Sequence, residues 1–517
     1  MLKIRNATSS DVAWLLVMPN TPAYGFLEDT AYLITADTHA GARFYIDDVE
    51  LHLSSHGSYR WQPSFYAGRV NAEVIETSGT SHLYWLDVSP TPKKSGDIQF
   101  AEMVAEIRLF DQALLGGTSA ATMAFGREGE PGFYDDDILL SRLRAHGVAF
   151  LDSVDTIARS PHLSWSAEDQ VIPLSRIRRL HPMALNDRRL AALASGSSVC
   201  GDALESIQLR SVTSSATFNT AANQTLLALL KRFRASIIRV REKVQALALK
   251  SPQEEQALRT ERRLIDLDKL DIRVKKLILG RPFIEISAAG MTSSGLTQIA
   301  SHPAYSKAYR IGCRALSTGI EGDEPSDMLH VNHSWGIYET WCYLTVLRCV
   351  QKVLGVSPIQ TRAKAVSAQL AFKVEMPDGG SLEMLFQATF PSAKPWQSRT
   401  GWSISRQRVP DVVLIVKKDK ITRSLILDAK WRSGRENVLE AMESAHIYHD
   451  SLRLDGATPK ACLLLLPGTT SVPGLEQQSF IDLHGVGTIS NFSVGGEGVE
   501  RLKENLINWL LYDPKTQ

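Results

Sequence analysis

The amino-acid sequence predicts a protein of the α/β class with a mixed sheet in its C-terminal part. Short apolar runs with turn residues between them fill the first third, and a long helical pattern follows. After about residue 325, helices alternate with strand-like runs. Because 517 residues are too many for one small domain, we expect three parts, at residues 1–215, 216–325 and 326–517.

The composition is that of an ordinary soluble globular protein, with 44% hydrophobic and 22% charged residues. The net charge of +1 shows no overall bias toward nucleic acid, so a basic site must be local. Five scattered cysteines without a CxxC pair indicate reduced thiols and no zinc site. The N-terminus does not resemble a signal peptide, and no apolar run approaches the roughly 20 residues of a membrane span. We therefore expect a cytoplasmic protein with no membrane contact.

The first part is predicted to be a β-rich α+β domain. Its apolar runs lie at residues 31–35, 42–46, 72–75 and 82–88, and a helical pattern covers residues 98–114. Residues 135–215 are expected to mix short helices and loops. No catalytic constellation is evident in this part, whose role stays open.

The second part is predicted to be a helical hairpin. Leu226, Leu230, Phe233 and Ile237 recur at three- and four-residue steps, Ser251-Pro252 interrupts the pattern, and a second helix follows. Residues 231–276 contain 14 Lys or Arg and 7 Asp or Glu. This excess of +7 indicates either a solvated helix face or a surface for phosphates or a partner protein. Residues 281–330 read as a loop-rich connection.

The third part alternates helices and strands in the order of a mixed-sheet domain. Helices are expected at residues 335–353, 437–454 and 499–511, and strands at 368–374, 382–390 and 461–466. Between them, residues 412–416 and 424–429 form two apolar runs around a charged tip, which predicts a β-hairpin.

Acidic and basic side chains gather at one end of this predicted hairpin. Asp411 opens the first apolar run, and Asp428 closes the second. Because side chains alternate along a strand, Asp428 and Lys430 share a face and Ala429 points the other way. Glu339 lies in an apolar helix and needs a partner, so it is the candidate third carboxylate.

These residue types suit the hydrolysis of phosphodiester bonds. Mg²⁺, or Mn²⁺ in its place, prefers oxygen ligands, which Glu339, Asp411, Asp428 and the backbone carbonyl of Ala429 could supply. Lys430 would orient the attacking water or offset developing negative charge. An Asp-x-Lys tripeptide alone is common by chance. The two flanking apolar runs and the Glu339 helix make the pattern specific.

The pattern Glu339, Pro410-Asp411 and Asp428-Ala429-Lys430 resembles the PD-(D/E)xK nuclease superfamily. More narrowly, it resembles the McrC-like branch of McrBC-type restriction systems, which has an N-terminal domain of formerly unknown function. The segments that carry this likeness are residues 338–341, 445–450 and 217–233. The resemblance implies a restriction-endonuclease-like domain in which Glu339, Asp411 and Asp428 bind metal, Lys430 assists catalysis, and His446 and Tyr448 lie beside the site. One departure is His449, where the family often has arginine.

The local charge agrees with a polyanionic substrate. Residues 406–435 contain 9 Lys or Arg and 3 Asp, and Arg406, Arg408 and Arg432 could hold phosphates. No GxxxxGK[ST] sequence is present, so the resemblance implies a separate AAA+ or GTPase motor subunit. We expect a Mg²⁺-dependent DNA endonuclease of a prokaryotic restriction or anti-phage system, possible as a homo-oligomer. The alternatives are a non-catalytic adaptor that binds DNA or stimulates an NTPase, and a nuclease that cuts RNA.

Overall fold

The computed structural model describes residues 1–8, 13–37, 41–55, 57–92, 94, 96–129, 135–177, 182, 186, 188, 190, 208–250, 254–321, 327–363, 366–376, 379–392, 400–418, 421–469 and 472–511. The chain divides into two compact units. The first comprises residues 1–138, 251–262 and 318–517, and the second comprises residues 139–250 and 263–317. None of the helices described is long and apolar enough to cross a membrane.

The N-terminal residues of the first unit form two sheets. Strands β1 (Leu2–Asn6), β2 (Leu15–Val17), β4 (Tyr32–Ala36) and β7 (Tyr59–Trp61) make a four-stranded sheet in the order β2-β1-β4-β7. A second, seven-stranded sheet contains the path β15-β10-β8-β5-β6, with β9 beside β8 and β3. Its strands are β3 (Pro22–Leu27), β5 (Arg43–Ile46), β6 (Val49–Leu51), β8 (Gly68–Ile75), β9 (Ser81–Ser89), β10 (Ala121–Phe125) and β15 (Asp327–His330). The prediction of a β-rich N-terminal part is confirmed.

Two strands that are far apart in the sequence pair at one edge of this second sheet. β10 precedes the second unit and β15 follows it, and they pair antiparallel from Thr122 opposite His330 to Phe125 opposite Asp327. The second unit is therefore an insertion between two paired strands of the first. Helix α1 (Gly96–Phe110) lies in the first unit close to its predicted position. The three-part division at residues 215 and 325 stays a prediction.

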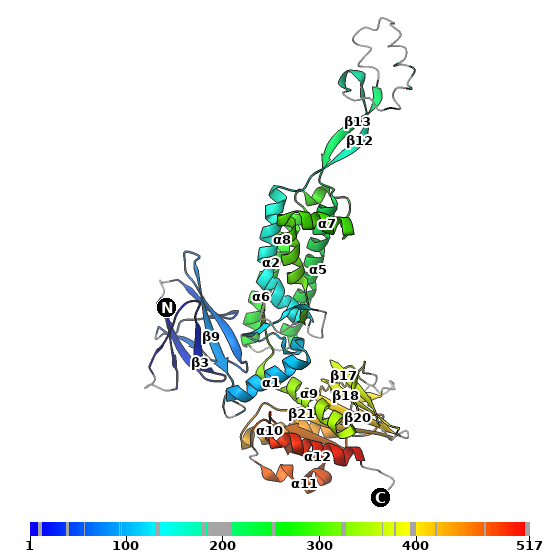
Figure 1. The fold of residues 1–517 in the computed structure, drawn as a ribbon. Helices are drawn as coiled ribbons and strands as arrows, with labels where there is room; N and C mark the ends of the chain where they lie inside the picture. The colour runs from blue at the N-terminus through cyan, green and yellow to red at the C-terminus, as the bar shows by residue number, and fades with distance from the viewer. Residues whose placement is uncertain are drawn as a thin grey trace. The chain divides into compact units, whose positions relative to one another are not determined.

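The second unit is helical, and it contains the predicted helical hairpin. Helices α5 (Ala221–Lys250) and α6 (Glu254–Ile278) form its arms, and α6 contributes residues 254–262 to the first unit. The core includes Leu226, Leu230 and Phe233 of α5, as the spacing predicts. Figure 1 shows α5, α6 and their neighbours α2 (Asp135–Arg159), α7 (Ser293–Ser301) and α8 (Pro303–Leu316) as one helical bundle.

Two expectations for this region are wrong. The described part of residues 135–215 is mainly the 25-residue helix α2 and an antiparallel pair of long strands, β12 (Ser164–Pro173) and β13 (Gln208–Thr217). Residues 281–330 contain α7 and α8, instead of mainly loops. The buried face of α8 recurs at three- and four-residue steps through Tyr305, Ala308, Gly312 and Ala315, so its helical pattern is readable in the sequence.

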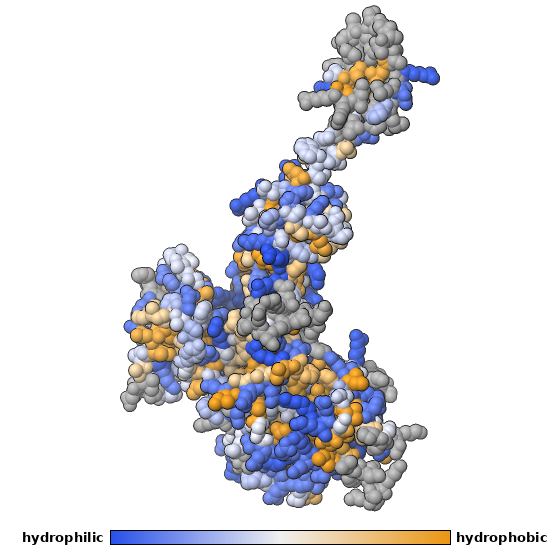
Figure 2. All heavy atoms as spheres, viewed as in Figure 1, coloured by the Kyte–Doolittle hydropathy of each residue, from blue (hydrophilic) through white to orange (hydrophobic). Residues whose placement is uncertain are grey.

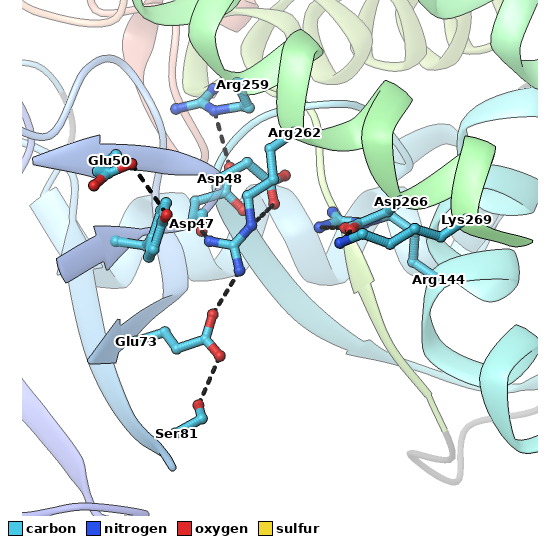
Figure 3. Close-up of polar contacts among 11 residues, drawn as sticks. Asp47, Asp48, Glu50, Glu73, Ser81, Arg144, Arg259, Arg262, Asp266 and Lys269 are labelled. Carbon is cyan, nitrogen blue, oxygen red and sulfur yellow. Dashed lines mark hydrogen bonds and ion pairs between the residues drawn. The ribbon is translucent and has the colours of Figure 1, made fainter. Parts of the chain in front are cut away.

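Several basic side chains of the helical hairpin neutralise acidic neighbours in the same unit. Arg234 Nε lies 2.8 Å from Asp271 Oδ1, and Arg241 Nη1 lies 2.9 Å from Asp268 Oδ1. Figure 3 shows a third acidic residue, Asp266, close to Arg144 and Lys269. The basic excess in residues 231–276 could belong to a solvated helix face or to a surface for phosphates or a partner protein. At Arg234, Arg241 and Lys269, these ion pairs support the first interpretation.

The C-terminal residues of the first unit form a seven-stranded mixed sheet in the order β16-β17-β18-β20-β21-β23-β24. β21 pairs antiparallel with β20 and parallel with β23, so the sheet is mixed, as the sequence predicts. The strands are β16 (Ile359–Gln360), β17 (Leu370–Glu375), β18 (Ser381–Phe386), β20 (Val412–Lys418), β21 (Ile421–Ala429), β23 (Ala461–Leu465) and β24 (Val486–Ile489). The prediction of an α/β protein with a C-terminal mixed sheet is confirmed.

Helices cover both faces of this sheet (Figure 1). Val412 and Leu414 pack in one core with α9 (Ser334–Leu354) and α12 (Glu497–Leu511), whereas Val413 and Ile415 pack in another with α10 (Arg435–Ser451). A strand that is apolar on both faces is therefore central, as its unbroken apolar run indicates. Figure 2 shows mainly hydrophilic residues, with scattered apolar ones, in the region of α12 and α11 (Gln478–His484).

Candidate active site

The β20–β21 hairpin brings two carboxylates together at one end of the sheet. In the antiparallel register, Val412 lies opposite Leu427. The next position of that register places Asp411 opposite Asp428, and both side chains are buried, with 7% and 1% of their surface exposed. Two acidic groups buried side by side are unfavourable unless cations or hydrogen-bond donors compensate them.

Three neighbouring groups compensate these carboxylates. Lys430 Nζ lies 2.6 Å from Asp428 Oδ2, and the Ser444 hydroxyl donates to the same oxygen at 3.0 Å. The backbone N–H of Ala429 donates to Asp411 Oδ2 at 2.8 Å. The second oxygen of Asp428, Oδ1, is buried and has no hydrogen-bond partner among the residues described. One buried oxygen of Asp428 is therefore available to a further cation or donor.

Glu339 reaches the same site from α9, and Gln387 links it to Asp411. The Gln387 side chain donates from Nε2 to Glu339 Oε2 at 2.9 Å, and its backbone N–H donates to the carbonyl of Asp411 at 2.7 Å. Gln387 has a φ of 47°, a left-handed conformation that is uncommon for a residue with a side chain. This conformation, directly after β18, is maintained by bonds to two of the three predicted metal ligands.

Burial and neighbouring charges shift the pKa values of Glu339, Asp411 and Lys430. Burial, with the charge of Asp428 as a further cause, raises the pKa of Glu339 to about 7 against the opposing charge of Lys430. Burial and the charges of Glu339 and Asp428 raise the pKa of Asp411 well above its usual range. Burial would lower the pKa of Lys430, but the carboxylates of Asp428 and Asp411 outweigh it and raise that pKa, so the ammonium stays charged.

The raised pKa of Glu339 predicts a pH-dependent stability for the metal-free protein. The folded state holds a proton on Glu339 up to about pH 7, whereas the unfolded chain releases it near 4.5. Because the folded state binds more protons between these values, its stability falls as pH rises through this window. Glu339→Gln should therefore stabilise the protein at pH 8 by roughly 1–3 kcal/mol and change it little at pH 4.5.

Thermal unfolding with a chelator present measures this difference. Glu443→Gln, an exposed position on α10, is the matched control and should show no such pH dependence. An equal effect of Glu339→Gln at both pH values would contradict the burial of an ionisable Glu339 in this cluster.

The ligand atoms that the site offers are of the type that Mg²⁺ and Mn²⁺ prefer. Glu339, Asp411 and Asp428 offer only oxygen atoms, which these ions prefer, and Asp428 Oδ1 is a buried acceptor without a partner in the described part of the chain. However, no three acidic, histidine or cysteine side chains of that part are arranged to hold a metal ion as they stand. The Lys430 ammonium already lies on Asp428. Metal binding would therefore require these side chains to rearrange.

The other predicted site residues differ in their placement. The Tyr448 hydroxyl donates to the Val409 carbonyl at 3.3 Å, and burial, together with the nearby charge of Asp428, raises the pKa of Tyr448. Arg432 is exposed and forms an ion pair of 2.6 Å with Glu440. Arg406 and His446 are exposed, and Arg408 is half-buried. Tyr448 therefore lies beside the carboxylates, whereas phosphate or DNA contacts of the arginines and His446 stay predictions.

Sequence reasoning missed Gln387 and Ser444. Ser444 lies four residues before Tyr448 on α10, so the helical repeat places both on one face. That spacing could have identified Ser444 once Tyr448 was a candidate. Gln387 carries no such signal, because its role depends on a contact with a helix 48 residues upstream.

Two family models match parts of this chain. A family model described as the PD-(D/E)XK nuclease superfamily matches residues 336–460, and one described as a domain of unknown function (DUF2357) matches residues 126–312. No curated protein matches the chain.

A chain from a solved Thermococcus gammatolerans complex of McrB AAA+ hexamers with bound McrC is similar at 11% identity. The match covers 83% of this chain and 84% of that chain, with a TM-score of 0.21, which supports no conclusion about the fold. The family match, in contrast, contains the Glu339 helix, the β20–β21 hairpin and α10. The C-terminal part of this chain is a domain of the PD-(D/E)xK nuclease superfamily.

Proposed function

We propose that this protein is a divalent-metal-dependent endonuclease that hydrolyses phosphodiester bonds of DNA. The observation that carries the proposal is the buried pair Asp411 and Asp428 with the Lys430 ammonium 2.6 Å from Asp428. A charged lysine beside two carboxylates, in a domain of a nuclease superfamily, suits a reaction that develops negative charge on a phosphate.

The residues of the chain have separate tasks in this proposal. Glu339, Asp411, Asp428 and the Ala429 carbonyl would hold Mg²⁺ or Mn²⁺. When bound, such an ion neutralises phosphate charge and lowers the pKa of water. Lys430 would leave Asp428 Oδ2 to hold the attacking water or to stabilise the pentacoordinate phosphate. Ser444 keeps a hydrogen bond of 3.0 Å to Asp428 Oδ2, which would orient that carboxylate.

We further propose that the protein is the effector subunit of a prokaryotic restriction or anti-phage system. The support is the combination of a C-terminal nuclease domain with a separate matched domain at residues 126–312, together with the McrC-like motifs of the sequence. A separate AAA+ or GTPase subunit would deliver the DNA. Magnesium as the ion, DNA as the substrate and this partner all belong to the proposal.

Cleavage of supercoiled plasmid DNA tests the proposed function. We expect nicked and linear products with Mg²⁺ or Mn²⁺, with or without the candidate motor subunit, and none with a chelator. A single-stranded RNA of matched length, run in parallel, separates the two nucleic acids. Metal-dependent cleavage of RNA alone would overturn the DNA assignment. No cleavage under any of these conditions would leave the adaptor as the better candidate.

A further inference from the structure

A cavity of about 550 Å³ opens beside Glu339 and Lys430. Its volume lies in the range of sites for small ligands, roughly 300–1,000 Å³. Away from the carboxylates, it is lined by Phe65 and Lys94 of the N-terminal part and by Trp335 at the start of α9. The proposed hydrolysis uses none of these three side chains, although all belong to the same compact unit as the carboxylates.

Two aromatic rings in this cavity are exposed but held in place. Trp335 has 41% of its surface exposed and stacks on His333, with ring centroids 5.4 Å apart and planes at 20°. Phe65 is 39% exposed, and the Lys94 ammonium lies 4.3 Å from its ring centroid. The backbone N–H of Ser334 donates to the Phe65 carbonyl at 2.9 Å, which ties the Phe65 loop to the first turn of α9. Exposed rings with fixed positions are suitable stacking platforms.

The position of Trp335 relates this platform to the proposed reaction. Trp335 and Glu339 are four residues apart on α9, so they lie on the same helix face about one turn apart. Both line the same cavity. A flat group stacked on Trp335 would therefore lie close to a phosphate held at the carboxylates.

The rim of the cavity carries groups that suit the polar edge of a nucleobase. The Asn437 amide and the Asp29 carboxylate both line it. Asn437 donates to the Ser433 carbonyl and Asp29 Oδ1 accepts from Gln62, which leaves the amide oxygen of Asn437, its second N–H and Asp29 Oδ2 for a ligand.

Lys94 keeps an ion pair of 3.3 Å with Glu28, which is fully buried, so its ammonium has a fixed position in the wall of the cavity. The cavity thus combines aromatic walls, polar groups and an adjacent candidate phosphate site. This combination suits a nucleotide whose base is not stacked on its neighbours in the nucleic acid.

We propose that this cavity binds an unpaired base of the DNA strand being cut, stacked against Trp335 and Phe65. The inference rests on the proposed nuclease function and adds its substrate class, which is DNA with a single-stranded or extruded nucleotide at the cleavage site. A base inside a duplex cannot enter the cavity, because it is stacked between its neighbours and paired. The N-terminal part of the chain thereby contributes to substrate selection through Phe65 and Lys94.

Binding of fluorescein-labelled oligonucleotides, measured by anisotropy in Ca²⁺ to avoid cleavage, tests this inference. We expect the wild-type protein to bind a single strand more tightly than the duplex of the same sequence. Trp335→Ala should weaken single-strand binding about 10-fold or more, because stacking of one base is worth roughly 1–3 kcal/mol. Duplex binding should change less than about twofold, and Trp335→Phe should restore most of the affinity.

Tyr24→Ala is the matched control, since Tyr24 is an exposed aromatic residue on β3 and does not line the cavity. Phe65→Ala is the second variant, and it should lower single-strand affinity in the same direction. Equal effects of Trp335→Ala on single strand and duplex, or none beyond that of Tyr24→Ala, would overturn the inference. Tighter binding of single-stranded RNA than of DNA would also overturn it.

The plasmid assay keeps this inference separate from the proposed function. If wild-type protein cuts DNA but Trp335→Ala leaves single-strand binding unchanged, the nuclease stands and the base pocket is wrong. If single-strand binding depends on Trp335 but no metal supports cleavage, the pocket is supported and the hydrolase is contradicted.

Discussion

Lys430→Met should reduce metal-dependent DNA cleavage by about 100- to 1,000-fold, the usual effect of removing one group that stabilises developing charge. The Lys430 ammonium lies 2.6 Å from Asp428, and the two carboxylates keep it protonated by raising its pKa. Methionine keeps the length of the side chain without the charge. Single-turnover cleavage of a labelled DNA at saturating metal measures the loss.

Lys417→Met is the matched control for this variant. Lys417 lies at the opposite end of β20, where it forms an ion pair of 3.1 Å with Asp455 and is 45% exposed. Its replacement should leave the cleavage rate unchanged within about twofold, as for other surface pairs. Thermal unfolding should show that Lys430→Met remains folded, because Ser444 still donates to Asp428. Undiminished cleavage by folded Lys430→Met would contradict the assignment of Lys430.

Arg259→Met should lower the free energy of unfolding of the first unit by about 3–5 kcal/mol, because it removes a guanidinium that is ion-paired with a buried carboxylate. Arg259 Nε lies 2.9 Å from Asp47 Oδ2, and the two side chains are only 6% and 5% exposed. Figure 3 shows this pair beside Asp48, Glu73 and Arg262, whose Nη2 lies 2.6 Å from Glu73. These pairs attach the first residues of α6 to the N-terminal sheets within one unit.

The double variant Arg259→Met with Asp47→Asn should recover much of this loss, since it removes the buried charge as well as its partner. Asparagine suits this position because residue 47 has a φ of 52°. Lys417→Met removes a more exposed pair of the same unit and should cost no more than about 1 kcal/mol. Guanidinium unfolding followed by tryptophan fluorescence reports on the first unit, to which every tryptophan except Trp165 belongs. A loss of similar size for Lys417→Met would contradict the special role of the buried pair.

The sequence predicts the centre of the candidate site because its residues mark the ends of strands. Asp411 and Asp428 flank two apolar runs, and a hairpin register then places them opposite each other. Such local signals depend on side-chain alternation and turn position, which the sequence displays directly. The helical hairpin was predictable for the same reason, since its apolar residues recur at regular steps.

Contacts between distant segments could not be predicted in this way. Gln387 joins the site through two hydrogen bonds and Ser444 through one, and the Phe65 carbonyl accepts from Ser334 across some 270 residues of chain. The pairing of β10 with β15 around an inserted helical unit has no local signal either. The strands β12 and β13 are polar along most of their length, so they lack the apolar alternation that identifies a strand.

Binding of Mn²⁺ to the metal-free protein, followed by the loss of its free electron-spin resonance signal, tests most directly whether Glu339, Asp411 and Asp428 form one metal site. We predict saturable binding by the wild-type protein at pH 8 and a loss of at least about 10-fold in affinity for Asp411→Asn and for Asp428→Asn separately. Glu443→Gln, the exposed variant on α10, should bind as the wild type does. Equal binding by the wild type and both aspartate variants would contradict the metal site and, with it, the proposed nuclease mechanism.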